Sequence, residues 1–126
     1  MYTHPNRTPP PRGGIVIAGP CAAGKTTLSQ GLIAHGYPAR QIAQEHSYVP
    51  DMWQRLSRPD VLVFLDASYE RCTERKHLSW TLAEYQEQLR RLAHARAHCH
   101  IYIDSDALSP EEVLAAAIRG LAQGKE

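Results

Sequence analysis

Eight residues near the N-terminus have the types and spacing needed to hold phosphate groups. Residues 19–26 read Gly-Pro-Cys-Ala-Ala-Gly-Lys-Thr, which matches G-x-x-x-x-G-K-[S/T] at every fixed position. In such a loop, backbone N–H groups surround the phosphates, the lysine reaches the outer phosphates and the hydroxyl binds Mg²⁺. We therefore expect a nucleoside triphosphate here, with Lys25 also catalytic and Thr26 a metal ligand. The residues expected to bind the nucleotide are Gly19, Cys21, Ala22, Ala23, Gly24, Lys25, Thr26 and Thr27.

The residues on either side of the loop predict the elements that must position it. The run 15–18 is short, apolar and β-branched, as in buried parallel strands. After the loop, Leu28, Leu32 and Ile33 keep helical spacing, and Gly36 is a helix stop. We predict a strand at 14–18 and a helix at 25–35, whose N-terminus adds partial positive charge to the phosphate site.

The rest of the chain continues the alternation of strands and helices. Further strands are predicted at 40–44, 61–65 and 101–103. Helices are predicted at 50–56, 69–76, 82–98 and 110–121, the third of them opened by a capping box of Thr81 and Glu84. This order predicts an α/β fold, a three-layer α/β/α sandwich with a short parallel sheet in a single domain at 14–126. Residues 1–13, rich in proline, are predicted to form a flexible tail.

Composition and charge limit the classes of partner that we expect for this chain. The chain has 126 residues and a net charge of +1, so charge gives no case for nucleic acid or membrane as a partner. Three widely spaced cysteines predict reduced thiols and a cytoplasmic location. No apolar run approaches the ~20 residues of a membrane span, and the N-terminus lacks the apolar stretch of a signal peptide.

Carboxylates follow two of the predicted strands, at the edge of the sheet where the loop must also lie. Asp66 ends the strand at 61–65, and Asp104 follows the strand at 101–103. Ligands of parallel sheets bind beyond the carboxyl ends of the strands. Asp66 is thus a candidate ligand of Mg²⁺, with the alternative that it caps the following helix.

The loop, the segment Asp-Val-Leu-Val-Phe-Leu-Asp at 60–66 and the arginines after it resemble a known family. Over about 14–120 the chain is similar to small P-loop kinases of the nucleotide and nucleoside (adenylate- and thymidylate-like) group. The resemblance implies the P-loop NTPase fold and transfer of the γ-phosphoryl group of ATP to a small-molecule acceptor with Mg²⁺. It also implies that Arg71 stacks on adenine, that Arg75 reaches the phosphates, and that Arg90 or Arg91 clamps the transferred group, for which we take Arg91. The loop around Asp104 would pass by the adenine.

Each of these roles has a plainer alternative. Arg71 and Arg75 could form an ordinary solvated helix face beside Glu70 and Glu74. We expect Trp53 to be a core residue rather than part of an acceptor pocket. Guanidinium groups nevertheless suit phosphoryl transfer, which depends on positioning and on stabilising charge at the phosphate oxygens.

The acceptor side is where the chain departs from the family. Only residues 37–59 separate the first helix from the strand at 61–65, so an acceptor-binding segment and one strand are missing. Glu45, after the strand predicted at 40–44, is the best candidate for a catalytic base or a Mg²⁺ contact. The alternative function is an ATP-binding, ATP-hydrolysing or regulatory module whose acceptor site is absent or is completed by a partner protein or a second copy. A GTPase is less favoured, because no N-K-x-D sequence occurs.

Overall fold

A computed structural model describes residues 13–76 and 80–123, and shows an α/β fold built on a parallel sheet. The strands are β1 (Ile15–Ala18), β2 (Ala39–Gln41), β3 (Val61–Asp66) and β4 (Ile101–Asp104), in the order β2-β1-β3-β4. The helices are α1 (Lys25–Ala34), α2 (Met52–Ser57), α3 (Tyr69–Lys76), α4 (Leu82–His98) and α5 (Pro110–Gln123), with a 3₁₀ turn η1 (Gln44–His46).

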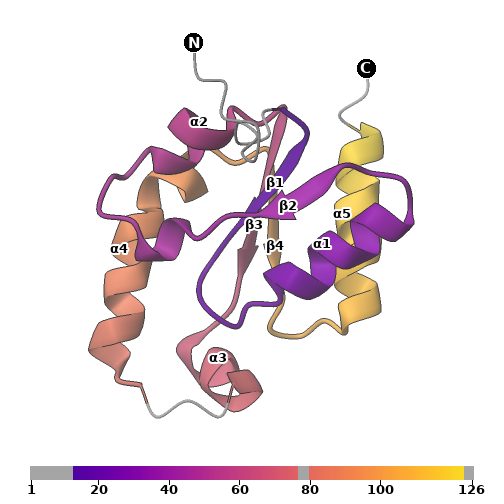
Figure 1. Cartoon of the computed structure of the whole chain (residues 1–126). Helices are drawn as coiled ribbons and strands as arrows, with labels where there is room; N and C mark the ends of the chain where they lie inside the picture. The colour runs from indigo at the N-terminus through magenta and orange to yellow at the C-terminus, as the bar shows by residue number, and fades with distance from the viewer. Residues whose placement is uncertain (1–12, 77–79, 124–126) are drawn as a thin grey trace, which may run out of the picture.

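Helices cover both faces of the sheet, so the layers are compatible with an α/β sandwich. In Figure 1 the sheet is seen nearly edge-on, with α1 and α5 on its right and α2 and α4 on its left. The core is accordingly divided in two, because successive side chains of a strand point to opposite faces. Val63 and Leu65 pack with α1 and α5, whereas Leu62 and Phe64 pack with Trp53 and α4.

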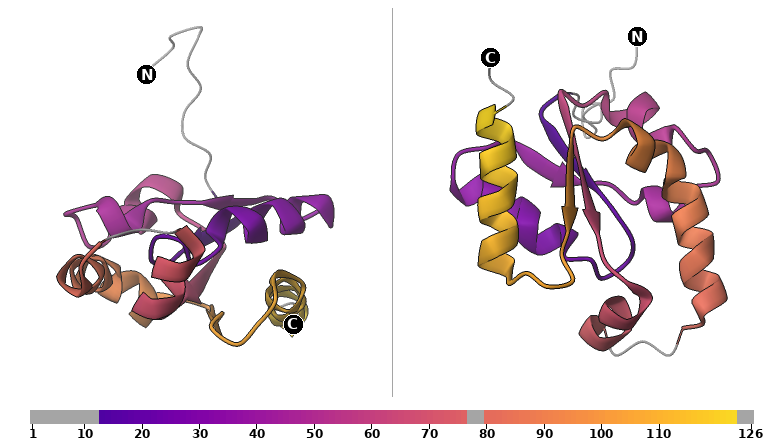
Figure 2. Two further views of the ribbon diagram at one scale, coloured as in Figure 1. Left: turned by 90° about the horizontal axis from the view of Figure 1, so that it is seen from below. Right: turned by 180° about the vertical axis from the view of Figure 1, so that it is seen from behind.

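The end of the sheet at the bottom of Figure 1 gathers three segments that are far apart in the sequence. The loop after β1, the start of α3 and the loop after β4 all lie there, and Figure 2 shows the same grouping from below and from behind. The strands are parallel and in register, so that Asp66 at the end of β3 pairs with Asp104 at the end of β4. The predicted convergence of these two strand ends is therefore confirmed.

Two of the helices have the bounds that the sequence predicts. The helices predicted at 69–76 and 82–98 are confirmed, and Thr81 and Glu84 form the expected capping box. Trp53 is a core residue, 4% exposed, as predicted.

The strand predicted at 40–44 is wrong at its end. Strand β2 stops at Gln41, and Gln44 begins the 3₁₀ turn. The Gln44 side chain is buried and bonds three backbone groups: Nε2 donates to the carbonyls of Val49 and Arg91, and Oε1 accepts from the N–H of Trp53. These bonds stabilise a turn at Gln44. If the strand continued through Gln44, its side chain could not make them.

Gly19 fixes how closely the loop approaches the sheet. A Cβ atom built at this position would lie 2.0 Å from the carbonyl oxygen of Leu65, the next-to-last residue of β3. Backbone cannot give way as a flexible side chain can, so only glycine allows the loop to cross the end of β3 at this distance.

We therefore expect Gly19→Ala to lower the free energy of unfolding by about 3 kcal/mol, because overpacking against backbone forces the loop or β3 to shift. Gly36→Ala is the matched control. Unlike Gly19, Gly36 has a positive φ, +88°, but a Cβ there meets nothing within 4 Å, so only backbone strain of about 1 kcal/mol is expected. Urea unfolding followed by circular dichroism measures both; equal losses would contradict the close approach.

Candidate functional site

The loop at 19–26 joins β1 directly to α1, and no side chain caps the start of the helix. Ala22 and Gly24 take positive φ values of +68° and +104°, which turn the chain sharply into the helix. Gly24 is the N-cap of α1 and supplies no side-chain hydrogen bond. The first-turn N–H groups of α1, with the positive end of the helix dipole, thus face the end of the sheet.

Lys25 is buried at the start of α1, and its ammonium group is surrounded by oxygen atoms. Nζ donates to the carbonyl of Gly19 at 2.6 Å and to Glu45 Oε2 at 2.5 Å, with the Pro20 carbonyl at 3.4 Å. The side chains of Lys25 and Glu45 are each only 6% exposed. The ion pair therefore joins α1 to η1 in a place where water screens it little.

Glu45 has one carboxylate oxygen without a partner. Within the described residues, Oε1 is buried and accepts no hydrogen bond, while Oε2 is paired with Lys25. An unsatisfied buried acceptor of this kind is costly and indicates a place for a donor or a cation. A hydroxyl group or a Mg²⁺-bound water would satisfy it.

Thr26 and Glu45 lie around one cavity of about 350 Å³ together with Lys25. The Thr26 hydroxyl accepts a hydrogen bond from Gln41 Nε2 at 2.5 Å. In the described part of the chain, no three His, Cys, Asp or Glu side chains are grouped as a metal site. A cation here would take most of its ligands from phosphates and water, which is how Mg²⁺ is usually bound beside nucleotides.

Arg75 connects this cavity to a second one. It lines both, and its guanidinium donates to the carbonyl of Ala23 at 3.2 Å and to the hydroxyl and carbonyl of Ser105, each at 3.1 Å. Five hydrogen-bonding N–H groups make arginine suited to hold two segments at once. Arg75 thus ties the glycine-rich loop to the loop after β4.

The second cavity, of about 390 Å³, is mainly apolar and lies beside the loop. Arg71 lines it, held by Asp106, whose carbonyl accepts from Nε at 2.9 Å, and by Glu74 at 3.2 Å. Its volume is in the range of small-molecule pockets. The other residues that line it are Ala23, Gly24, Thr27, Leu28, Leu65, Ser105, Leu108, Pro110 and Val113.

Four of the predicted site residues line neither cavity: Gly19, which packs against β3, and Asp66, Asp104 and Arg91. Asp66 accepts from the Tyr102 hydroxyl at 2.5 Å and lines a separate cavity on the α4 side of the sheet. Asp104 accepts from the N–H of Asp106. Arg91 is paired with Glu87 at 3.2 Å and donates to the Glu45 carbonyl at 3.4 Å, so it contacts the backbone of η1.

Two glutamines that contact the site have no signal in the sequence. Gln41 ends β2 beside Thr26, and Gln88 on α4 accepts the N–H of Cys21 through Oε1 at 2.9 Å. A glutamine at a strand end or on a helix matches no motif. Only the three-dimensional packing reveals that Gln88, 8% exposed, faces the loop and not solvent.

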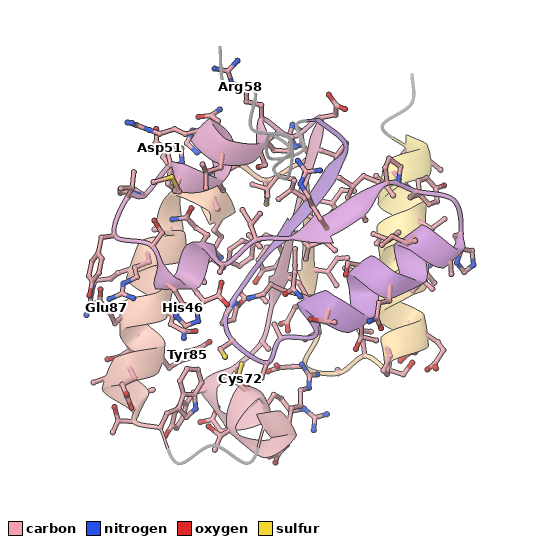
Figure 3. All side chains as sticks on the ribbon, in the orientation of Figure 1. His46, Asp51, Arg58, Cys72, Tyr85 and Glu87 are labelled. Carbon is pink, nitrogen blue, oxygen red and sulfur yellow. The ribbon has the colours of Figure 1, made fainter. Side chains whose placement is uncertain are left out.

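Two other titratable side chains near the loop are unsuited to acid–base chemistry. Figure 3 labels Cys72 and Tyr85 at the same end of the molecule as the loop. Burial raises the pKa of Cys72 to about 11 and the pKa of Tyr85 to about 12. Both remain protonated near neutral pH, which leaves Glu45 as the carboxylate in the cavity.

No protein-family model matches the chain, and no curated protein matches it significantly. None of the described helices is long and apolar enough to cross a membrane.

The buried ion pair gives a stability prediction. We expect Lys25→Met to lower the free energy of unfolding by about 3 kcal/mol, because it leaves the Glu45 charge buried without compensation. The double variant Lys25→Met/Glu45→Gln should recover most of that loss, since no charge remains. Urea unfolding of both variants and of Glu45→Gln completes the double-mutant cycle. If the double variant is no more stable than Lys25→Met, the two charges do not interact.

Proposed function

We propose that the chain is a minimal P-loop NTPase of the kinase type, which binds ATP and Mg²⁺ and transfers the γ-phosphoryl group to a small-molecule acceptor. The observation that carries the proposal is the buried Lys25–Glu45 pair beside the loop: both residues line one cavity, and Glu45 Oε1 is buried without a partner among the described residues. It provides one cation for phosphate oxygens and one unsatisfied acceptor for a hydroxyl or a metal-bound water.

The two adjoining cavities support a donor nucleotide that spans them. The apolar cavity beside Arg71 would take the base, and the cavity of Lys25, Thr26 and Glu45 would take the phosphates. Arg75 borders both, which would put a guanidinium near the phosphate chain. Backbone N–H groups of the loop and of the first turn of α1 would hold the phosphate oxygens.

Phosphoryl transfer requires no covalent intermediate with the protein, whose main role would be to position the reactants and stabilise charge. The acceptor oxygen would bond to the γ-phosphorus while the bond from that phosphorus to the bridging oxygen of ADP breaks. Glu45 would take the hydroxyl proton of the acceptor through Oε1. Lys25 would offset the negative charge on the phosphate oxygens, and Mg²⁺, held through Thr26, would supply the remaining positive charge.

A second function is favoured by how little structure lies between α1 and β3. Apart from β2, this segment consists of η1 and the six-residue α2, which pack on α4 and on the sheet. No separate acceptor-binding unit is present among these described residues. An ATP-binding or ATP-hydrolysing module, completed by a partner protein or a second copy, is therefore the alternative.

ATP binding tests the site itself. We expect the wild-type chain to bind ATP in the presence of Mg²⁺, and Lys25→Met to weaken binding at least a hundredfold by removing a buried cation from the phosphates. Isothermal titration calorimetry measures the affinity. Lys25→Met/Glu45→Gln, which should be folded, separates loss of the lysine from loss of stability. Unchanged binding by the double variant would refute the assignment.

ADP formation distinguishes the two functions. A coupled assay with nucleosides, nucleotides, sugars and small acids as acceptors should show at least one that raises ADP release well above the rate with water alone. Glu45→Gln should lower that rate about a thousandfold while leaving ATP affinity within a few-fold, since a general base contributes 10²–10⁴-fold. If no acceptor raises the rate, the binding or hydrolysing module is supported instead.

A further inference from the structure

Gln41 is placed to act on Thr26 by the geometry of β2. Within this strand Ala39 and Gln41 lie on one face, and Arg40 lies on the other, where it donates to the Ser57 carbonyl of α2. Gln41 is in register with Ile17, and the next N–H, that of Ile42, donates to the Ile17 carbonyl at 3.0 Å. The backbone is therefore held by β1, and the Gln41 side chain is directed toward the first turn of α1.

The side-chain contact is specific. Gln41 Nε2 donates to Thr26 Oγ1 at 2.5 Å, and both residues line the cavity that also contains Lys25 and Glu45. Thr26 is exposed at the helix N-terminus, so its hydroxyl would otherwise rotate freely about its bond to Cβ. The bond from β2 restricts that rotation.

We propose that Gln41 is a positioning residue for Mg²⁺, which orients the Thr26 hydroxyl toward the cation. The inference rests on the proposed function. A hydroxyl has one proton and two lone pairs. With one lone pair occupied by Gln41, the other is left in a fixed direction for the cation, and the proton is left for a phosphate oxygen or water. Residues that orient a metal ligand in this way affect metal affinity about 10- to 100-fold.

The same contact also allows the opposite interpretation, in which Gln41 weakens Mg²⁺ binding. If Gln41 competed with Mg²⁺ for the lone pair of Thr26, its removal would strengthen Mg²⁺ binding. The positioning role predicts the reverse sign, so a single substitution separates the two.

The experiment compares ATP affinity in saturating Mg²⁺ with affinity in EDTA, and measures the Mg²⁺ concentration that half-saturates the difference. For Gln41→Ala and Gln41→Leu we expect that concentration to rise about tenfold, with ATP affinity in EDTA unchanged within twofold. Gln41→Glu should stay within about threefold of wild type, because its carboxylate can orient the hydroxyl by accepting a hydrogen bond from it. Gln30→Ala, at an exposed glutamine of α1, is the matched control.

Each other outcome overturns the proposal in a distinguishable way. An unchanged Mg²⁺ requirement in Gln41→Ala refutes the positioning role and leaves the proposed function intact. A lowered requirement shows that Gln41 weakens Mg²⁺ binding. Equal losses with and without Mg²⁺ show a general structural role. If the wild-type chain binds no ATP at all, the proposed function fails, and the role of Gln41 fails with it.

Discussion

The ion pair between Lys25 and Glu45 is the interaction on which the rest of the site depends. It lies beneath the glycine-rich loop and joins the first residue of α1 to the 3₁₀ turn that follows β2. Two charges are kept out of water there, which is unfavourable unless each is compensated. Lys25 is compensated by two loop carbonyls as well as by Glu45, whereas Glu45 keeps one oxygen unsatisfied. Within the described residues, the carboxylate of Glu45 is therefore only half satisfied.

Helix α4 contacts both the glycine-rich loop and the turn η1. Gln88 accepts a loop N–H, and one turn further on the carbonyl of Arg91 accepts from Gln44, the residue beside Glu45. The loop and the turn that carries the Glu45 carboxylate are thus attached to the same face of one helix. Precise placement of charged groups by rigid elements is what phosphoryl transfer requires, since its catalysis depends mainly on positioning and electrostatics. On the carboxylate side the cavity is built from the short turn η1 and not from a separate binding segment.

Local patterns in the sequence predicted the elements and the loop, but not the contacts between distant segments. The capping box of Thr81 and the apolar run of β3 each depend on a few neighbouring residues, so both can be recognised from the sequence alone. The end of β2 was misjudged because the Gln44 side chain bonds the backbone of Val49, Trp53 and Arg91, the last of them 47 residues away. Asp66 and Asp104 do meet at one sheet edge, yet their carboxylates bond Tyr102 and Asp106. Strand ends predict the edge on which a side chain lies, and packing decides where it points.

The most direct test of the central claim is the amide spectrum of the ¹⁵N-labelled protein during titration with ATP and Mg²⁺. Backbone N–H groups of the loop are expected to hold the phosphates, so the resonances of Ala22, Gly24 and Lys25 should shift first and furthest. The N–H of Gly120, on α5, should be unaffected and serves as the internal reference. Saturating shifts confined to the loop and its two cavities would support the account. A spectrum that ATP leaves unchanged, or one whose shifts lie elsewhere, would contradict it.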